Sequence, residues 1–293
     1  RLNSRMKICA ITMVYRDHWA LSQWYAHYSR HLGAENLFVI AHGADPEIQR
    51  ICPQASVVTS PRDELEHLDL TRGRIMNAFQ TGLDEVYDWV IRTDADELIC
   101  FDPAQYSSFA DVFHGRTEFA LFALGLELAE QPDEPELQAG MSALRHRSRA
   151  KFSSHYSKAW AVRRRIGLRR HGVEVRPRFA GSFRFLLPTG VYLVHLKYAN
   201  SKALSEANAV RKEIARTAGE GLPGRAWQNA DATARKFRKR LEQLPLTPWE
   251  IAEPEAYAKL STNPVRDPDK GVVRVRNILA RAAVDLPDWF RDA

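Results

Sequence analysis

Short apolar runs rich in valine and isoleucine alternate along the chain with segments of helical periodicity. Apolar runs bounded by polar or turn residues are typical of buried strands, and their alternation with helices predicts a layered α/β fold. Residues Trp19–Leu32 and Leu70–Leu83 repeat large apolar side chains at helical spacing and are expected to be helices. Strands are expected at Ile8–Val14, Leu37–Ile40, Ala55–Thr59, Trp89–Arg92, Phe119–Leu126, Ala159–Arg163 and Val191–Leu196.

The pattern changes after Asn200. Charged helical patterns over Ser201–Ala218 and Ala226–Leu244 follow one another with no strand pattern between them. We therefore place a boundary near residue 200, with an α/β domain over residues 1–200 and a helical C-terminal region over residues 201–293. Residues 1–5 are left out of this reasoning.

Composition is that of an ordinary globular protein. The chain has 293 residues, of which 45% are hydrophobic, enough for one large or two modest domains. Its three cysteines are widely spaced, which argues against a disulfide framework and predicts a reducing compartment. No apolar run approaches the roughly 20 residues of a membrane-spanning helix. We expect a cytoplasmic protein, with peripheral contact to the inner face of a membrane left open.

The net charge of +6 hides a strong asymmetry. Between Met141 and Phe185, thirteen lysines or arginines stand against one acid, Glu174. Such a basic segment predicts an anionic partner, such as a diphosphate, an acidic glycan or a lipid headgroup, although a solvated basic face is the simpler alternative. Nucleic acid is not expected, because the sequence has no zinc-finger spacing and no aromatic-interleaved RNA motif.

Three carboxylates in four residues follow the apolar run Trp89–Ile91. Asp94, Asp96 and Glu97 repel one another unless a cation, arginines or hydrogen bonds compensate them. In an Asp-x-Asp on an extended chain, both side chains leave on the same side and can face one divalent cation. The alternative is an acidic turn that caps a helix.

This run resembles the Asp-x-Asp motif of glycosyltransferases of the GT-A fold, specifically family 2-like enzymes. The resemblance covers roughly the first two thirds of the chain. It implies a GT-A, Rossmann-like mixed sheet flanked by helices. It also implies an inverting transfer of a sugar from a nucleotide-diphosphate donor, expected to be a UDP-sugar, to a glycan or glycolipid acceptor. Such reactions belong to polysaccharide biosynthesis. Three further segments fit it: Lys7–Tyr15, Phe38–Asp45 and Leu193–Lys197.

The resemblance also implies a metal site and a donor site. Mn²⁺ or Mg²⁺ would be held by Asp94 and Asp96, with Asp94 also toward the donor's ribose or sugar. His195 resembles the C-terminal metal-ligand histidine of many GT-A enzymes, although a lone histidine in an apolar strand is usually a core residue.

Ligands of open α/β sheets bind beyond the carboxyl ends of the strands, and polar residues follow the first two strands here. The resemblance implies that these strand ends hold the nucleoside. The polar residues are Tyr15, Asp17 and Asp45. Asp45 is the expected acceptor for a base N–H, and its alternative role is to cap a helix that begins at Pro46.

Two arginines precede the acidic run. Arg72 and Arg74 suit phosphate oxygens or the acidic cluster, and the alternative is a surface position for either.

An inverting transfer needs a group that takes the acceptor's proton. The resemblance places this group downstream of the acidic run, where the candidates are Glu174 and His171, with Glu127 third. Asp94, expected toward the donor's ribose or sugar, also counts among the catalytic residues. For Glu174 the alternative is a pair with a neighbouring arginine.

Two other functions stay open at this stage. A nucleotidyltransferase or phosphotransferase could use the same two aspartates with Mg²⁺, and a non-enzymatic module could bind anionic glycans or lipids through the basic segment.

Overall fold

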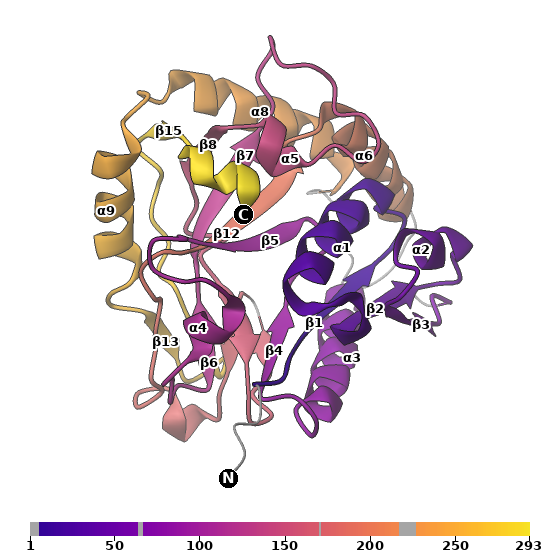
Figure 1. Cartoon of the computed structure of the whole chain (residues 1–293), viewed down its shortest axis with the longest axis vertical. Coiled ribbons are helices and arrows are strands. Elements are labelled where there is room, and N and C mark those ends of the chain that lie inside the picture. Colours follow the sequence, from indigo (N-terminus) through magenta and orange to yellow (C-terminus); the bar gives the residue numbers. More distant parts are fainter. Residues whose placement is uncertain (1–5, 64–66, 170, 217–226) are drawn as a thin grey trace.

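The computed structural model describes residues 6–63, 67–169, 171–216 and 227–293. The predicted helix ends at 217–218 and 226, and Arg170 of the basic segment, lie outside the described residues. Figure 1 shows the N-terminal strands and helices on one side of the molecule and α9 on the opposite side.

The first sheet has a Rossmann-like parallel core. Its strand order is β3-β2-β1-β4-β9-β6, in which β1 to β4 run parallel and β9 is antiparallel to both neighbours. All seven residues of β1 are buried, as expected for a strand covered on both faces. The strands are β1 (Ile8–Val14), β2 (Leu37–His42), β3 (Ser56–Ser60), β4 (Trp89–Arg92), β6 (Ala120–Phe122) and β9 (Ala159–Val162).

Three helices connect and cover these strands. They are α1 (His18–Leu32), α2 (Pro46–Ile51) and α3 (Leu68–Leu83). Trp24 and Tyr28 of α1 are fully buried, and α3 lies beside β1, β4 and the β10 strand described below. The connections β1–α1–β2 and β3–α3–β4 place the carboxyl ends of β1, β2 and β4 at one edge of the sheet.

The second sheet has the order β15-β8-β7-β12-β5 and is mixed. Strand β12 (Val191–Tyr198) pairs parallel with β7 (Leu124–Ala129) and antiparallel with the edge strand β5 (Glu97–Phe101), so that His195 lies opposite Glu97. On the other side of β7 lie β8 (Arg149–Phe152) and then the edge strand β15 (Ala283–Asp285). Because β5 follows directly after the short turn that ends β4, the acidic run crosses from one sheet to the other.

A small antiparallel sheet lies next to α3. Its order is β10-β11-β14-β13, with β10 (Leu168–Arg169) and β11 (Gly172–Glu174) joined as a hairpin. The partners β14 (Val272–Arg274) and β13 (Val265–Asp267) come from the C-terminal region. The other α-helices among the described residues are α4 (Phe109–Phe113), α5 (Ala143–His146), α6 (Ser201–Arg216), α8 (Ala230–Gln243) and α9 (Trp249–Leu260).

The predicted α/β architecture, a mixed sheet flanked by helices with further helices after residue 200, is confirmed. Several details differ from the sequence prediction, and β5, β8, β10 and β11 were not expected. Phe119–Leu126 is not one strand but two, β6 and β7, which belong to different sheets. The C-terminal region also contributes β13, β14 and β15, which pair with each other or with strands of the first 200 residues.

The three cysteines are free and buried. None of the described helices is long and apolar enough to cross a membrane.

Candidate functional site

Two cavities adjoin at the carboxyl ends of β1, β2 and β4. The first, which we call the strand-end cavity, has a volume of about 450 Å³ and is lined by residues that follow these strands and by α6. The second, the hairpin cavity, has a volume of about 650 Å³ and lies between α3 and the β10–β11 hairpin. They share Asp69, Arg72, Asp94 and His171.

The turn Thr93–Asp96 brings the acidic run to this place. Trp24 Nε1 donates a hydrogen bond to Thr93 Oγ1 at 2.9 Å, and the Asp94 N–H donates to Glu97 Oε2 at 3.0 Å. Glu97 is completely buried. The turn is therefore fixed from both sides, and Asp94 is held at the boundary between the two cavities.

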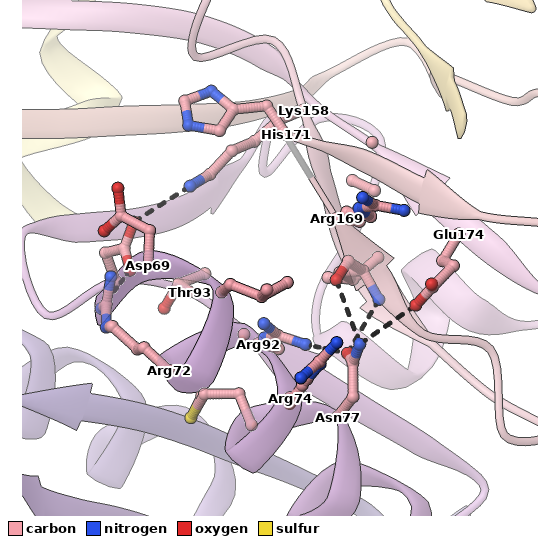
Figure 2. A pocket seen from close by; sticks show the side chains of 17 residues that line it. Asp69, Arg72, Arg74, Asn77, Arg92, Thr93, Lys158, Arg169, His171 and Glu174 are labelled. Atoms are coloured by element: carbon pink, nitrogen blue, oxygen red, sulfur yellow. Dashed lines mark hydrogen bonds and ion pairs between the residues drawn. The ribbon is translucent and has the colours of Figure 1, made fainter. Parts of the chain in front are cut away.

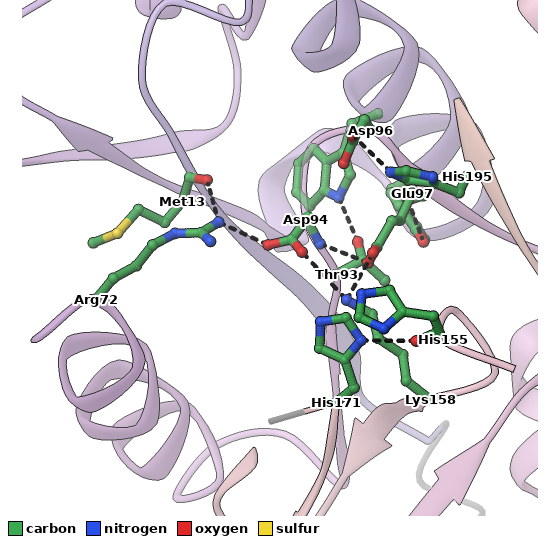
Figure 3. Close-up of polar contacts among 12 residues, drawn as sticks. Met13, Arg72, Thr93, Asp94, Asp96, Glu97, His155, Lys158, His171 and His195 are labelled. Carbon is green, nitrogen blue, oxygen red and sulfur yellow. Dashed lines mark hydrogen bonds and ion pairs between the residues drawn. The ribbon is translucent and has the colours of Figure 1, made fainter. Parts of the chain in front are cut away.

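Protein cations compensate two of the three carboxylates (Figure 3). Lys158 Nζ lies 2.7 Å from Glu97 Oε1 and 3.2 Å from Asp94 Oδ2, and Arg72 Nη2 donates to Asp94 Oδ1 at 2.7 Å. Burial alone would raise the pKa of Asp94, but Lys158 and Arg72 hold it well below its usual value. Asp94 is therefore ionised and has both oxygens engaged.

Asp96 faces a different partner. Its Oδ2 lies 3.0 Å from His195 Nε2, and the His195 ring stacks on Tyr156 with ring centres 3.6 Å apart. Burial acts to raise the pKa of Asp96, and His195 lowers it below the usual value. His195 Nδ1 is buried without a hydrogen-bond partner among the described residues.

The three predicted metal ligands thus line the strand-end cavity together but do not converge on one point. In the described part of the chain, no group of three or more histidine, cysteine, aspartate or glutamate side chains is arranged to hold a metal ion. A joint metal site of Asp94, Asp96 and His195 stays a prediction, and Asp94 is the member whose oxygens are already engaged by cations.

His171 is held in one tautomer. Its Nδ1 lies 2.7 Å from the His155 carbonyl oxygen, which can only accept, so Nδ1 carries the hydrogen and Nε2 keeps a free lone pair. The residue has a φ of 63°, an uncommon conformation for a non-glycine residue. Burial, with Lys158 and His155 nearby, lowers the pKa of His171 to about 3. The imidazole is neutral at physiological pH and lines both cavities.

Only two of the three residues expected to bind the nucleoside line the strand-end cavity. Tyr15 and Asp17 line the strand-end cavity, together with Arg62, whose guanidinium lies 3.5 Å from the centre of the Tyr15 ring. Burial, with a contribution from Asp96, raises the pKa of Asp17 to about 6.

Asp45 lines neither of these two cavities. Its carboxylate accepts from the Glu47 N–H at 3.1 Å and lies 2.7 Å from His18 Nε2. The alternative role, as cap of the helix that begins at Pro46, is confirmed.

The other candidates lie at or beyond the hairpin cavity (Figure 2). Arg74 is exposed and lines it, and Glu174 is exposed at its edge, where Asn77 Nδ2 lies 3.4 Å away. Glu127 pairs with Lys151 and lines neither cavity.

The basic segment does not form one unpaired surface. Of the twelve cationic residues of this segment that the structure describes, seven pair with acids, all of which come from elsewhere in the chain. At the far end of β9 from Lys158, the Arg163 guanidinium lies over the Trp89 ring and Arg164 over Phe119, while Arg165 pairs with Glu85. The simpler alternative, a solvated basic face, therefore does not describe the whole segment, and its anionic partner stays a prediction.

Sequence reasoning missed four residues of the site. Lys158 was only one member of the basic segment, and His155, Tyr156 and Arg62 carried no recognisable pattern. A fifth residue, Arg92, did carry a signal, because a charge that ends an otherwise apolar strand is unusual.

No protein-family model matches the chain, and no curated protein matches it. Among solved structures, core-mannan synthase A from Aspergillus fumigatus in its Mn/GDP form is 10% identical with a TM-score of 0.27; the match covers 46% of this chain and 45% of that one, less than half its length. Mannose-1-phosphate geranyltransferase from Thermus thermophilus is 12% identical over 96% of this chain and 74% of that one, with a TM-score of 0.30.

A third structure, CMP:2-keto-3-deoxy-manno-octonic acid synthetase complexed with CTP, is 14% identical over 81% of this chain and 99% of that one, with a TM-score of 0.28. Scores this low say nothing about activity, so any functional conclusion must come from the residues of the two cavities.

Proposed function

We propose that the protein is a glycosyltransferase that transfers a sugar from a nucleotide-diphosphate donor, most plausibly a UDP-sugar, to a hydroxyl of a sugar acceptor. The observation that carries this proposal is the pair of cavities that meet at Asp94 and His171. The donor occupies the strand-end cavity and the acceptor the hairpin cavity, so that the reacting atoms lie at their boundary.

The strand-end cavity has the groups that a nucleotide diphosphate requires. Tyr15 offers an aromatic face to a base, and Arg62 and Arg72 offer N–H donors to phosphate oxygens. Ligands of parallel sheets bind at this edge, beyond the carboxyl ends of the strands.

The donor set fits a divalent cation that takes most of its ligands from the diphosphate. Mg²⁺ and similar hard cations are commonly held by one or two carboxylates plus phosphate oxygens, and Asp96 is the carboxylate here whose partner is a histidine rather than a cation. Asp96, with His195 beside it, would hold Mn²⁺ or Mg²⁺, which neutralises charge that develops on the leaving diphosphate.

His171 is the base in this proposal. The acceptor oxygen forms a bond to the anomeric carbon, the bond from that carbon to the diphosphate breaks, and the acceptor's proton moves to His171 Nε2. The Nδ1–H bond to the His155 carbonyl orients the ring for this transfer. Asp94 is poorly suited, because Arg72 and Lys158 occupy both of its oxygens. Glu174 is the alternative base at the far side of the hairpin cavity.

The proposal predicts metal-dependent nucleotide binding. Calorimetric titration of the wild-type protein with UDP, GDP and CDP, each with and without Mn²⁺, should show tightest binding for one nucleotide with Mn²⁺. Asp96→Asn should lose the Mn²⁺-dependent part of that affinity, about tenfold or more, because one negatively charged ligand is lost while the fold persists.

Asp292→Asn is the matched control, since Asp292 is an exposed carboxylate that pairs with Arg145 and lines neither cavity. Undiminished Mn²⁺-dependent binding in Asp96→Asn would remove the metal assignment. Absence of binding for all three nucleotides in the wild type would remove the donor assignment itself. A labelled UDP-sugar then distinguishes sugar transfer from nucleotidyl transfer by its product.

A further inference from the structure

Arg92 is a partly buried cation without an anionic partner. Its Nη1 donates to the side-chain oxygen of Asn77 and lies 3.4 Å from Gln80 Oε1, so both of its contacts are neutral amides. No carboxylate of the described residues lies within ion-pair distance of it. A buried guanidinium is costly unless something compensates its charge.

The guanidinium belongs to the wall of the hairpin cavity (Figure 2). Asn77 fixes its place, because Asn77 Oδ1 also accepts from the Leu168 N–H at 3.0 Å and Asn77 Nδ2 lies 3.3 Å from the Leu168 carbonyl. Arg92 Nη1 is therefore tied to the β10–β11 hairpin, while its Nε and Nη2 make no hydrogen bond to any described residue and remain available to a ligand.

The rest of the wall has the same sign of charge. Arg74 and Arg169 line the cavity without a carboxylate partner among the described residues, and Arg169 donates only to the Lys270 carbonyl at 3.3 Å. The wall has three carboxylates, of which Asp94 is compensated by Arg72 and Lys158. The other two, Asp69 and Glu174, make no ion pair with a described residue, but the three unpaired arginines outnumber them. The unpaired charge of this cavity is therefore net positive.

We infer that the hairpin cavity recognises an acceptor sugar that carries a carboxylate or a phosphate, with Arg92 as the residue that binds the anionic group. This inference rests on the proposed function, because it takes the acceptor to occupy this cavity. A planar guanidinium suits both anions, since each presents two oxygens to its N–H donors. Binding of the anion at Arg92 would leave the hydroxyls of the sugar facing the boundary with the strand-end cavity, where His171 lies.

The test uses three probes that share a sugar ring: methyl glucuronide, glucose 6-phosphate and neutral methyl glucoside. Binding to the full chain is measured by saturation-transfer NMR and calorimetry, without nucleotide and with saturating UDP. At least one charged probe should bind about tenfold or more tightly than the neutral one, as expected for a charge-assisted contact. Arg92→Gln should remove that preference, and Arg92→Lys should restore part of it.

Two further variants and inorganic phosphate serve as additional tests and controls. Arg169→Gln, on the hairpin surface, should weaken the charged probes without the risk to folding that a change at Arg92 carries. Arg240→Gln, an exposed arginine of α8 that lines neither cavity, should change nothing. Inorganic phosphate should bind more weakly than glucose 6-phosphate.

The outcomes separate this inference from the proposed function. Three results would overturn the inference while leaving UDP binding intact. They are equal binding of the charged and neutral probes, an undiminished preference for charged probes in both Arg92→Gln and Arg169→Gln, and inorganic phosphate that binds as tightly as glucose 6-phosphate. Failure of UDP binding with a preserved, Arg92-dependent preference would instead overturn the donor assignment and leave the anion site.

Discussion

Removal of the Lys158 ammonium tests how the acidic run is kept folded. Lys158 and Glu97 are both buried, and their charged atoms lie 2.7 Å apart. At an effective dielectric constant of about 20, this separation corresponds to roughly 6 kcal/mol of attraction before the desolvation cost. In Lys158→Met, a shape-similar apolar side chain takes the place of the ammonium and leaves the Glu97 carboxylate buried and uncompensated. Loss of one partner of a buried pair costs about 3–5 kcal/mol, which is the decrease in unfolding free energy we expect at about pH 8.

The pH dependence of that loss has a definite sign. In the folded protein the pKa of Glu97 is raised, by burial first and by Asp94 and Asp96, while Lys158 lowers it. A carboxyl with a raised folded pKa contributes stability below its unfolded pKa of about 4.3 and loses that contribution as pH rises through the folded value. Without Lys158 the pKa rises further. The difference between variant and wild type should therefore be largest near pH 8 and shrink toward about pH 5, as Glu97 takes up a proton.

Urea denaturation followed by tryptophan fluorescence measures both effects, and a double-mutant cycle assigns them. Lys158→Met combined with Glu97→Gln should recover more than half of the lost stability, because the new amide keeps an oxygen for the Asp94 N–H but carries no charge. A loss below about 1 kcal/mol in Lys158→Met, a loss that does not depend on pH, or a double variant no more stable than the single one would refute the compensation argument.

Two further predictions concern the chemistry and its support. His171→Gln should lower turnover by a factor on the order of 10² or more, with UDP affinity unchanged. Because the pKa of His171 is lowered, the acid limb of the wild-type pH–rate profile should lie well below about pH 6.5. Normal turnover of the variant would transfer the base role to Glu174. Gly125→Ala should weaken UDP binding severalfold. The new Cβ would lie 2.3 Å from the Tyr156 carbonyl carbon and would displace the loop that carries Tyr156 and Lys158. The control is Gly82→Ala, which has open space around it and should bind UDP like the wild type.

The extent to which this fold follows from sequence depends on the range of the interactions that decide each element. β1 and β4 are continuous apolar runs, so their burial and their parallel pairing follow from local composition. β5 was missed because Glu97–Phe101 continues the mostly apolar pattern of β4. Only its pairing with β12 shows that this segment belongs to the second sheet. The three-residue strands β13 to β15 have no period of their own and exist only through their partners.

The candidate site, like the fold, could be predicted from the sequence only in part. Three adjacent carboxylates require compensation, and the sequence makes that requirement visible, but it does not say which cation supplies it. Lys158 lies 64 residues beyond Asp94 and reaches it only because β9 pairs antiparallel with β4, which places the start of β9 beside the end of β4. Arg72 reaches the same carboxylate from α3. These two protein cations compensate Asp94 and Glu97, whereas Asp96 pairs with a histidine. In the proposed function Asp96 would therefore be the carboxylate that holds a metal, with the diphosphate supplying further ligands.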